Sequence, residues 1–153
     1  MGIPEKEIVQ VLKSIVGKIA DKDIVRRLDG GVNLLVRWVP RLPRDIDIRT
    51  NEAGYDIFKQ TFLWMKKEEW YDEKKKKYYM IFDMQWVEVE IAYYDKEAGY
   101  MNMFEHIVEK NRNNITIPVL PLAQMKQFYT WIWSTEKIQL IEDFLIQNST
   151  FKI

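Results

Sequence analysis

The chain has no cysteine among its 153 residues and only one histidine. The missing thiols exclude disulfides and thiol catalysis, and they fit a reducing compartment, so we expect a cytoplasmic protein. A zinc site is not indicated either, because His106 has no cysteine or second histidine as a co-ligand. The longest uncharged run, Asn113 to Met125, contains two prolines and is too short to cross a bilayer. We therefore expect no membrane partner.

An excess of charge of either sign is also missing. Lysine and arginine together number 23, as do aspartate and glutamate, so the formal net charge is zero. No global electrostatic field would then draw the protein to nucleic acid. The charged beginning of the chain has no apolar core of a signal peptide. The length suits one domain with a substantial core, and we expect residues 1–153 to form it.

Hydrophobic spacing predicts both helices and strands, and hence an α/β (α+β) fold in which helices flank a mixed β-sheet. Helical spacing extends over Pro4–Ala20, from Val32 to a stop at Pro40, Glu52–Glu69 and Met101–Arg112. Strands are predicted over Asp23–Leu28, Asp45–Thr50, Lys77–Phe82, Trp86–Tyr94 and Ile115–Leu120. Because Pro118 cannot donate a main-chain hydrogen bond, the last strand should lie at a sheet edge. A C-terminal helical pair is predicted within residues 122–147, as Leu122–Trp133 and Glu136–Gln147.

The most informative stretch runs from Asp29 to Ile48, DGGVNLLVRWVPRLPRDIDI. Side chains alternate along a strand, so Asp45 and Asp47 should share one face above an apolar layer. Two carboxylates so close together remain ionised most easily with a cation between them. The preceding glycine pair, Gly30 and Gly31, allows a tight turn whose free N–H groups can meet an anion. Phosphate at the glycines and metal at the aspartates would together form a nucleoside-triphosphate site.

Gly30-Gly31, the spacer 32–44 and the Asp-Ile-Asp-Ile strand resemble the signature of the DNA polymerase β-like nucleotidyltransferase superfamily. The stretch is especially similar to the short nucleotidyltransferases of the minimal and abortive-infection toxin types, in which proline and arginine often precede the acids. Here these are Pro40, Arg41, Pro43 and Arg44. The resemblance implies transfer of a nucleoside monophosphate from a nucleoside triphosphate to an acceptor hydroxyl.

The resemblance also implies roles for individual residues. Asp45 and Asp47 would hold Mg²⁺ or Mn²⁺, with a third carboxylate from a neighbouring strand. Glu90 is our first choice for that carboxylate and Glu88 our second. Phosphate binding would fall to Gly30 and Gly31, helped by Arg41 and Arg44, whose alternative role is that of ordinary surface arginines. In the helical pair, Lys126 and Asp143 loosely match a lysine and an aspartate that are common in the toxin-type tail.

One residue departs from the pattern, since Asp29 stands where the family has an apolar side chain. We expect Asp29 to point outward as a turn residue, because burying an unpaired charge is too costly. The alternative to an enzyme is a catalytically degenerate relative that acts as a binding module or a toxin–antitoxin-like interaction module. The acceptor stays open between nucleic acid, protein and small molecule.

Two further segments carry competing interpretations. The lysine run Lys74–Lys77 could guide a nucleic-acid backbone, although a solvated hairpin edge is the commoner role of such a run. The aromatic run Phe128–Trp133 could stack a base, but aromatic clusters also form cores and homodimer interfaces. A weaker reading of both segments is a small nucleic-acid-binding protein.

Overall fold

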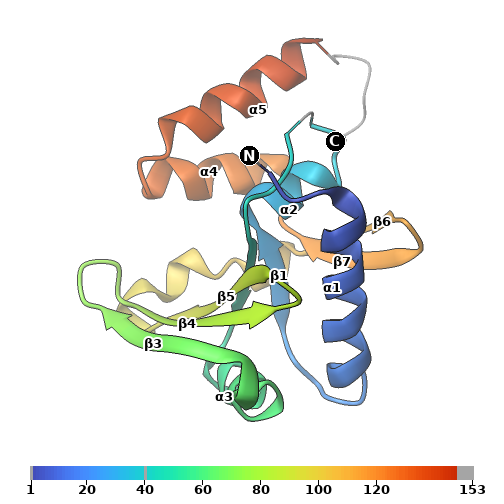
Figure 1. The fold of residues 1–153 in the computed structure, drawn as a ribbon. Helices are drawn as coiled ribbons and strands as arrows, with labels where there is room; N and C mark the ends of the chain where they lie inside the picture. Colours follow the sequence, from blue (N-terminus) through green and yellow to red (C-terminus); the bar gives the residue numbers. More distant parts are fainter. Residues whose placement is uncertain (1, 40, 148–153) are drawn as a thin grey trace.

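The computed structural model describes residues 2–39 and 41–147 (Figure 1). Within these residues, five strands form one mixed sheet in the order β1-β2-β5-β4-β3, and two more form a separate hairpin. The sheet contains β1 (Arg26–Asp29), β2 (Ile46–Thr50), β3 (Lys66–Asp72), β4 (Lys77–Met84) and β5 (Val87–Tyr94); the hairpin contains β6 (Val108–Arg112) and β7 (Ile115–Val119). The helices are α1 (Glu5–Ile19), α2 (Gly30–Leu35), α3 (Glu52–Thr61), α4 (Leu122–Trp131) and α5 (Thr135–Gln147). Short 3₁₀ turns are η1 (Leu63–Met65), η2 (Lys96–Met101) and η3 (Phe104–His106).

The central strand pair of the sheet is parallel, and its other pairs are antiparallel. Strand β2 runs parallel to β5 and antiparallel to β1, and the hairpin β4–β5 continues antiparallel into β3. A parallel pair needs a long crossover connection, which α3, β3 and β4 supply here. The two ends of the crossover, β2 and β5, are therefore neighbours in space although they are far apart in the sequence.

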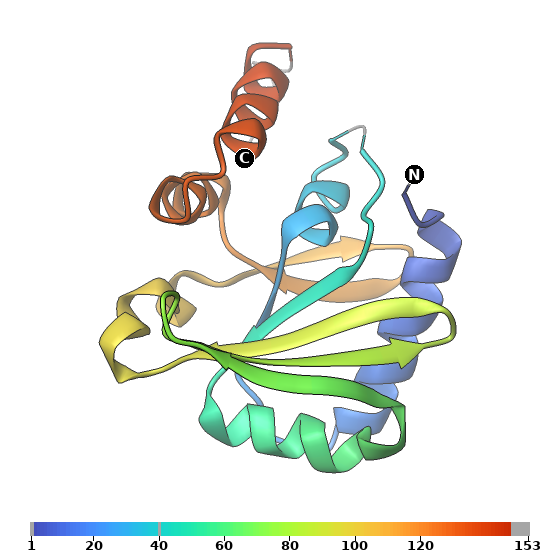
Figure 2. The same ribbon diagram turned by 60° about the vertical axis from the view of Figure 1, so that its left-hand side comes forward.

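One face of the sheet carries the main hydrophobic core. Ile46 and Ile48 of β2 and Val89 and Ile91 of β5 are all at most 1% exposed. They pack in one cluster with apolar side chains of α1 and α3. Figure 2 shows α3 along this face, with α4 and α5 on the other side of the sheet. The alternation along β2 leaves the intervening aspartates for the opposite face, as the sequence predicts.

The C-terminal helices form a second core on that opposite side. Phe128 and Tyr129 of α4 and Ile141 of α5 pack in one cluster with Tyr94 of β5 and Met101 of η2. The helical pair therefore covers part of the polar face of the sheet (Figures 1 and 2). The predicted mixed sheet with flanking helices and a C-terminal helical pair is confirmed.

Three predicted helices differ from the structure. The helix predicted over Glu52–Glu69 ends at Thr61, and residues 66–72 form the edge strand β3. This strand was not predicted, because its many charged side chains do not show the alternation of a strand. The helix predicted over Met101–Arg112 is wrong, because residues 108–112 pair with β7. The intervening Asn113 and Asn114 both have positive φ, which is the conformation that a tight two-residue hairpin turn requires. The helix predicted from Val32 to a stop at Pro40 begins at Gly30 and ends at Leu35, and Pro40 itself lies outside the described residues.

Strand β7 contains Pro118 and belongs to the small hairpin, in agreement with its predicted edge position. Asn51 caps α3 by accepting a hydrogen bond from the Gly54 amide at 2.8 Å. In the part of the chain that the structure describes, no helix has both the length and the apolar character needed to cross a bilayer.

Candidate functional site

Strand register places three acidic residues side by side on the polar face of the sheet. Asp47 of β2 is the cross-strand partner of Asp29 on β1 and of Glu90 on β5. Directly opposite residues on neighbouring strands project to the same face, so these side chains form a row. Asp45 immediately precedes β2 and shares the parity of Asp47. The structure thus brings Asp45, Asp47 and Glu90 together, whereas Glu88 lies opposite Asp83 on an exposed part of the β4–β5 hairpin.

The two glycines at the start of α2 are packed too closely for any side chain. Gly30 has φ +60°, and a Cβ atom there would lie 2.5 Å from Oδ2 of Asp47. A Cβ atom on Gly31 would lie 2.8 Å from the backbone Cα of Pro43. The glycine pair therefore lets the start of α2 approach both the acidic row and the loop before β2. This contact places the main chain of α2 beside the Asp47 carboxylate.

Asp29 does not point outward as the sequence led us to expect. Its side chain is 6% exposed and accepts two hydrogen bonds from Arg27, at 2.9 and 3.2 Å. Arg49 Nε lies 3.5 Å from Asp29 Oδ2. Arg27 is fully buried and also donates to the carbonyl oxygen of Met101 at 3.0 Å. Arg27 and Arg49, both buried, thus compensate the negative charge of Asp29. An unpaired charge would have made the burial of Asp29 too costly.

Glu90 is paired with two cations, Arg49 of β2 and Lys77 of β4. Arg49 Nη1 lies 2.8 Å and Lys77 Nζ 4.0 Å from Glu90 Oε2. Burial acts to raise the pKa of Glu90, but the two cations outweigh it and hold that pKa below its usual value. Burial and the charge of Arg49 lower the pKa of Lys77 to about 7. Glu90 is therefore a carboxylate that stays ionised near neutral pH.

The two aspartates of the motif are less well compensated. Burial and the charge of Glu90 raise the pKa of Asp45. Burial, with Glu90, Asp45 and Asp29 nearby, raises the pKa of Asp47 to about 7, although Arg49 acts in the opposite direction. Burial is the largest cause for both residues, and the neighbouring cations do not compensate it.

The chemistry of this donor set fits a hard divalent cation. Across residues 2–39 and 41–147, no three acidic or histidine side chains are gathered at metal-binding distances. Mg²⁺ commonly binds one or two carboxylates together with substrate phosphates, and it does not require a cage made wholly of protein. Asp45 and Asp47 offer oxygen ligands only, and a cation bound to them would offset the burial and the charge of Glu90 that raise their pKa values.

Sequence reasoning missed the basic residue nearest to the glycine turn. Lys137 of α5 has its Nζ 3.9 Å from the position that a Gly30 Cβ would take, and 5.1 Å from the centre of the Tyr129 ring. Its charge also lowers the pKa of Asp45 against the effect of burial. Only the packing of α5 over the sheet reveals this position, because nothing in the local sequence distinguishes Lys137 from other surface lysines.

The loosely matched pair in the C-terminal helices makes other contacts. Lys126 Nζ pairs with Glu142 Oε1 at 2.6 Å, and Asp143 accepts a hydrogen bond from Gln139 at 2.8 Å. Both interactions lie within the helical pair. Lys137 is thus the lysine of this region that reaches the motif.

The two arginines before the acidic strand are placed differently from each other. Arg41 Nη1 lies 2.9 Å from Glu136 Oε1, which ties the loop before β2 to the first turn of α5. Arg44 is exposed and close enough to lower the pKa of Asp45. Of these two arginines, Arg44 is the one near Asp45, and no ion pair joins it to an acid within the described residues.

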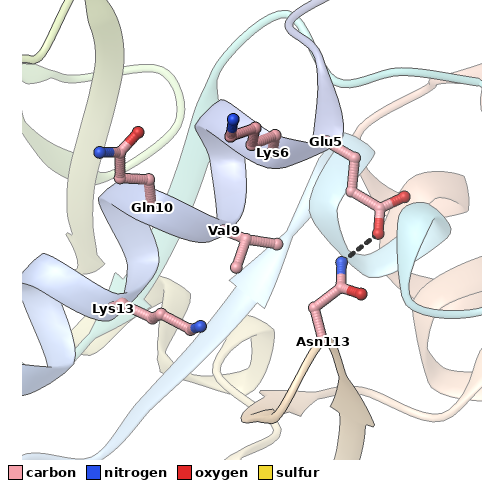
Figure 3. A pocket seen from close by; sticks show the side chains of 6 residues that line it. All are labelled: Glu5, Lys6, Val9, Gln10, Lys13 and Asn113. Carbon is pink, nitrogen blue, oxygen red and sulfur yellow. Dashed lines mark hydrogen bonds between the residues drawn. The ribbon is translucent and has the colours of Figure 1, made fainter.

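A hollow away from the acids lies between α1 and the β6–β7 turn (Figure 3). It has a volume of about 500 Å³ and includes Glu5, Lys13 and Asn113 in its lining. Glu5 and Asn113 point toward each other and are hydrogen-bonded. The hollow is open, and none of the motif residues lines it.

Comparison with solved structures identifies two nucleotidyltransferases of similar architecture. One, from Thermotoga maritima, is provisionally named a nucleotidyltransferase; it has a TM-score of 0.72 and 20% identity, over 95% of this chain and 97% of that one. The other is the lincosamide antibiotic adenylyltransferase LnuA bound to lincomycin, with a TM-score of 0.61 and 16% identity, over 93% of this chain and 98% of that one. No family model and no curated protein matches the sequence. From its glycine turn to its C-terminal helical pair, the chain therefore has the nucleotidyltransferase fold.

Proposed function

We propose that the protein is a nucleotidyltransferase that depends on Mg²⁺ or Mn²⁺ and moves a nucleoside monophosphate from a nucleoside triphosphate to an acceptor hydroxyl. The observation that carries this proposal is the position of Asp45, Asp47 and Glu90 on one face of the sheet, next to the Gly30 turn. The nucleotidyltransferase fold of the chain supports it. The donor nucleotide and Mg²⁺ are both cytoplasmic, where we expect the protein to act.

The donor triphosphate would lie between the glycine turn and α5. Neither glycine has a side chain of its own, so the N–H groups at Gly30 and Gly31 could donate hydrogen bonds to the β- and γ-phosphates. Lys137 supplies a positive charge beside Gly30, and Arg44 supplies another beside Asp45. Asp45 and Asp47 would hold the metal, which when bound neutralises developing phosphate charge and orients the reacting oxygens. The protein contributes mainly position and charge.

Glu90 is the residue best placed to serve the acceptor. In the reaction, the acceptor oxygen forms a bond to the α-phosphorus while the bond from that phosphorus to the bridging oxygen breaks. The bond electrons leave with pyrophosphate, and the hydroxyl proton passes to Glu90 and then to water. Its lowered pKa keeps Glu90 ionised, as a proton acceptor must be, and at the same time makes it a weak base. Glu88 is further from Asp47 in the register and takes no part in this scheme.

Labelled nucleoside triphosphates, Mg²⁺ and a pool of acceptors test the proposal. Adenosine triphosphate is the first donor to try and lincomycin one of the acceptors, because LnuA is an adenylyltransferase bound to that compound. We expect the variants Asp45→Ala and Asp47→Asn to lose at least about 100-fold in transfer, a typical cost of removing a group that stabilises a transition state. Asp83→Asn changes an exposed acid on β4; it is the matched control and should keep activity.

Calorimetry with Mn²⁺ or Mg²⁺ separates metal binding from transfer. Asp47→Asn should abolish divalent binding, and Glu90→Gln should weaken it more than Glu88→Gln does. If Glu88→Gln has the larger effect, the acceptor-side acid has been wrongly chosen. Unchanged binding in Asp47→Asn would refute the metal site.

The ion pair between Arg49 and Glu90 favours a second function. It neutralises Glu90 without any metal, as would suit a relative that has kept the fold and acts as a toxin–antitoxin-like interaction module. Wild-type protein that binds metal but retains no triphosphate under any tested condition would support this module and contradict the enzyme.

A further inference from the structure

A hollow of about 380 Å³ lies beside Arg49 and Lys77, the two cations that pair with Glu90. It lies between the β3–β4 turn, η2 and the end of α4. Its lining combines positive charge with aromatic rings and includes Arg49, Lys75, Lys77, Tyr94, Tyr100 and Trp131. Within the described residues, no acidic side chain lines it. This composition is suited to a ligand that is both anionic and flat.

The positive charge comes from two levels of the hollow. Lys74 and Lys75 stand exposed at its rim, and no ion pair joins either of them to an acid among residues 2–39 and 41–147. Lys77 and Arg49 lie buried at its inner end. Lys74 and Lys75 therefore supply the charge that is free to attract an anion such as a phosphate group, because Arg49 and Lys77 already pair with Glu90.

The aromatic wall comes from η2 and from the end of α4. The rings of Tyr100 and Trp131 meet edge to face, with centroids 5.2 Å apart. Trp133 also lines the hollow, is 86% exposed and has φ +59° in the turn that follows α4. An exposed tryptophan beside a fixed aromatic pair offers a surface on which a planar ring can stack.

Arg49 connects the hollow to the proposed reaction centre. It lines the hollow and donates to Glu90 at 2.8 Å. The glycine turn follows Asp29, which pairs with Asp47, whereas the hollow is lined by Arg49, two residues further along β2, and by Tyr94, four residues beyond Glu90 on β5. A ligand in the hollow would therefore approach from the side of Glu90, opposite the triphosphate.

We propose that this hollow binds the acceptor, and that the acceptor carries a flat ring and an anionic group in one molecule, as a nucleotide does. The inference rests on the proposed function, since it takes the hydroxyl beside Glu90 to be the one that receives the nucleotidyl group. The lysines bind the anionic group and the aromatic wall binds the ring. The nucleotide can be free or can end a single strand.

Calorimetry with four probes tests the pairing of ring and charge. Adenosine 5′-monophosphate carries both features, adenosine only the ring and ribose 5-phosphate only the charge; a single-stranded RNA pentanucleotide carries both at the end of a strand. The protein is first saturated with Mg²⁺ and a non-hydrolysable adenosine triphosphate analogue. We expect the monophosphate to bind at least about tenfold more tightly than adenosine or ribose 5-phosphate. Still tighter binding of the pentanucleotide would identify a strand end as the source, and weaker binding a free nucleotide.

Matched variants locate the binding. The double variant Lys74→Gln/Lys75→Gln and the variant Trp133→Ala should each weaken monophosphate binding about five- to tenfold. The controls are Lys6→Gln/Lys13→Gln, two exposed lysines on α1, and Trp64→Ala, a tryptophan that is 98% exposed on η1. The controls should leave binding unchanged, and every substituted side chain is exposed, so folding should be preserved.

Three results would overturn the proposal. One is monophosphate binding that the Lys74, Lys75 and Trp133 variants leave unchanged. The second is competition between the monophosphate and the triphosphate analogue, which would assign the hollow to the donor base. The third is equal affinity for adenosine and its monophosphate. If transfer is never detected but monophosphate binding follows the variants, the proposed enzyme fails and the hollow remains a nucleotide-binding site.

Discussion

The buried pair of Arg27 and Asp29 should make a large contribution to stability. Their side chains are 0% and 6% exposed, and Asp29 is the acid that Arg27 contacts. In Asp29→Ala the guanidinium would keep only main-chain acceptors at Met101 and Asn102. Leaving one partner of a buried ion pair uncompensated costs about 3–5 kcal/mol. We therefore expect Asp29→Ala to lose that amount from a total stability of about 5–15 kcal/mol.

Urea denaturation followed by tryptophan fluorescence measures the effect. With a slope of about 1–3 kcal/mol per molar urea, the midpoint should fall by more than about 1 M. The control is Asp23→Ala, an exposed acid before β1 that should change stability by less than about 0.5 kcal/mol. A double variant, Arg27→Met/Asp29→Leu, should be more stable than Asp29→Ala, because it removes the stranded cation as well.

A loss of less than about 1 kcal/mol in Asp29→Ala would refute this reasoning. It would mean that Arg49, or water entering the site, replaces the lost carboxylate without cost. The double variant gives an independent check. If it is less stable than Asp29→Ala, the contribution of Arg27 comes from its hydrogen bonds to the main chain and not from charge pairing.

Two further variants test the packing of the site and of the N-terminal helix. Gly31→Ala should destabilise the fold by about 1–3 kcal/mol, since the new methyl group would lie 2.8 Å from Pro43 Cα. The control is Gly17→Ala, where a methyl group would meet no other atom. If the Gly31→Ala protein melts at the same temperature as the control protein, the close approach of Gly31 to Pro43 is contradicted. Glu5→Gln should cost about 1 kcal/mol at pH 7, because Arg112 hydrogen-bonds Glu5 and lowers its pKa. That stabilisation is present above the usual glutamate pKa of 4.5 and is lost as the pH falls through the depressed pKa, so the difference between the two proteins should vanish in acid melts. A difference that persists in acid would contradict the charge pairing.

The motif strand could be predicted because its pattern is local. Alternation of Asp45, Ile46, Asp47 and Ile48 assigns one face to polar contacts and one to the core, and the register places Glu90 beside Asp47 as expected. The glycine pair was also informative, since close approach of backbone leaves room for no other residue. At these positions the local sequence alone shows why an acid, an apolar residue or a glycine is needed.

The remaining parts depend on contacts that no local pattern encodes. Strand β3 carries a Lys-Lys-Glu-Glu run and is recognised only through its pairing with β4. Burial of Asp29 became acceptable only because Arg27 and Arg49 lie on the same face. Lys137 reaches the site from α5, and its position depends on how the second core packs. Tertiary structure decides each of these.

The parallel pairing of β2 with β5 also determines when the site can form during folding. The β3–β4–β5 meander consists of local hairpins, which form readily because little chain entropy is lost in closing them. Asp47 and Glu90 meet only after the whole crossover has formed and β5 has paired with β2. A chain with its hairpins complete would thus still lack the acidic row. Partial opening between β2 and β5 would separate Asp47 from Glu90 while much of the secondary structure persisted. The amides of β2 and β5 should then exchange their hydrogens under conditions in which the protein is not yet globally unfolded.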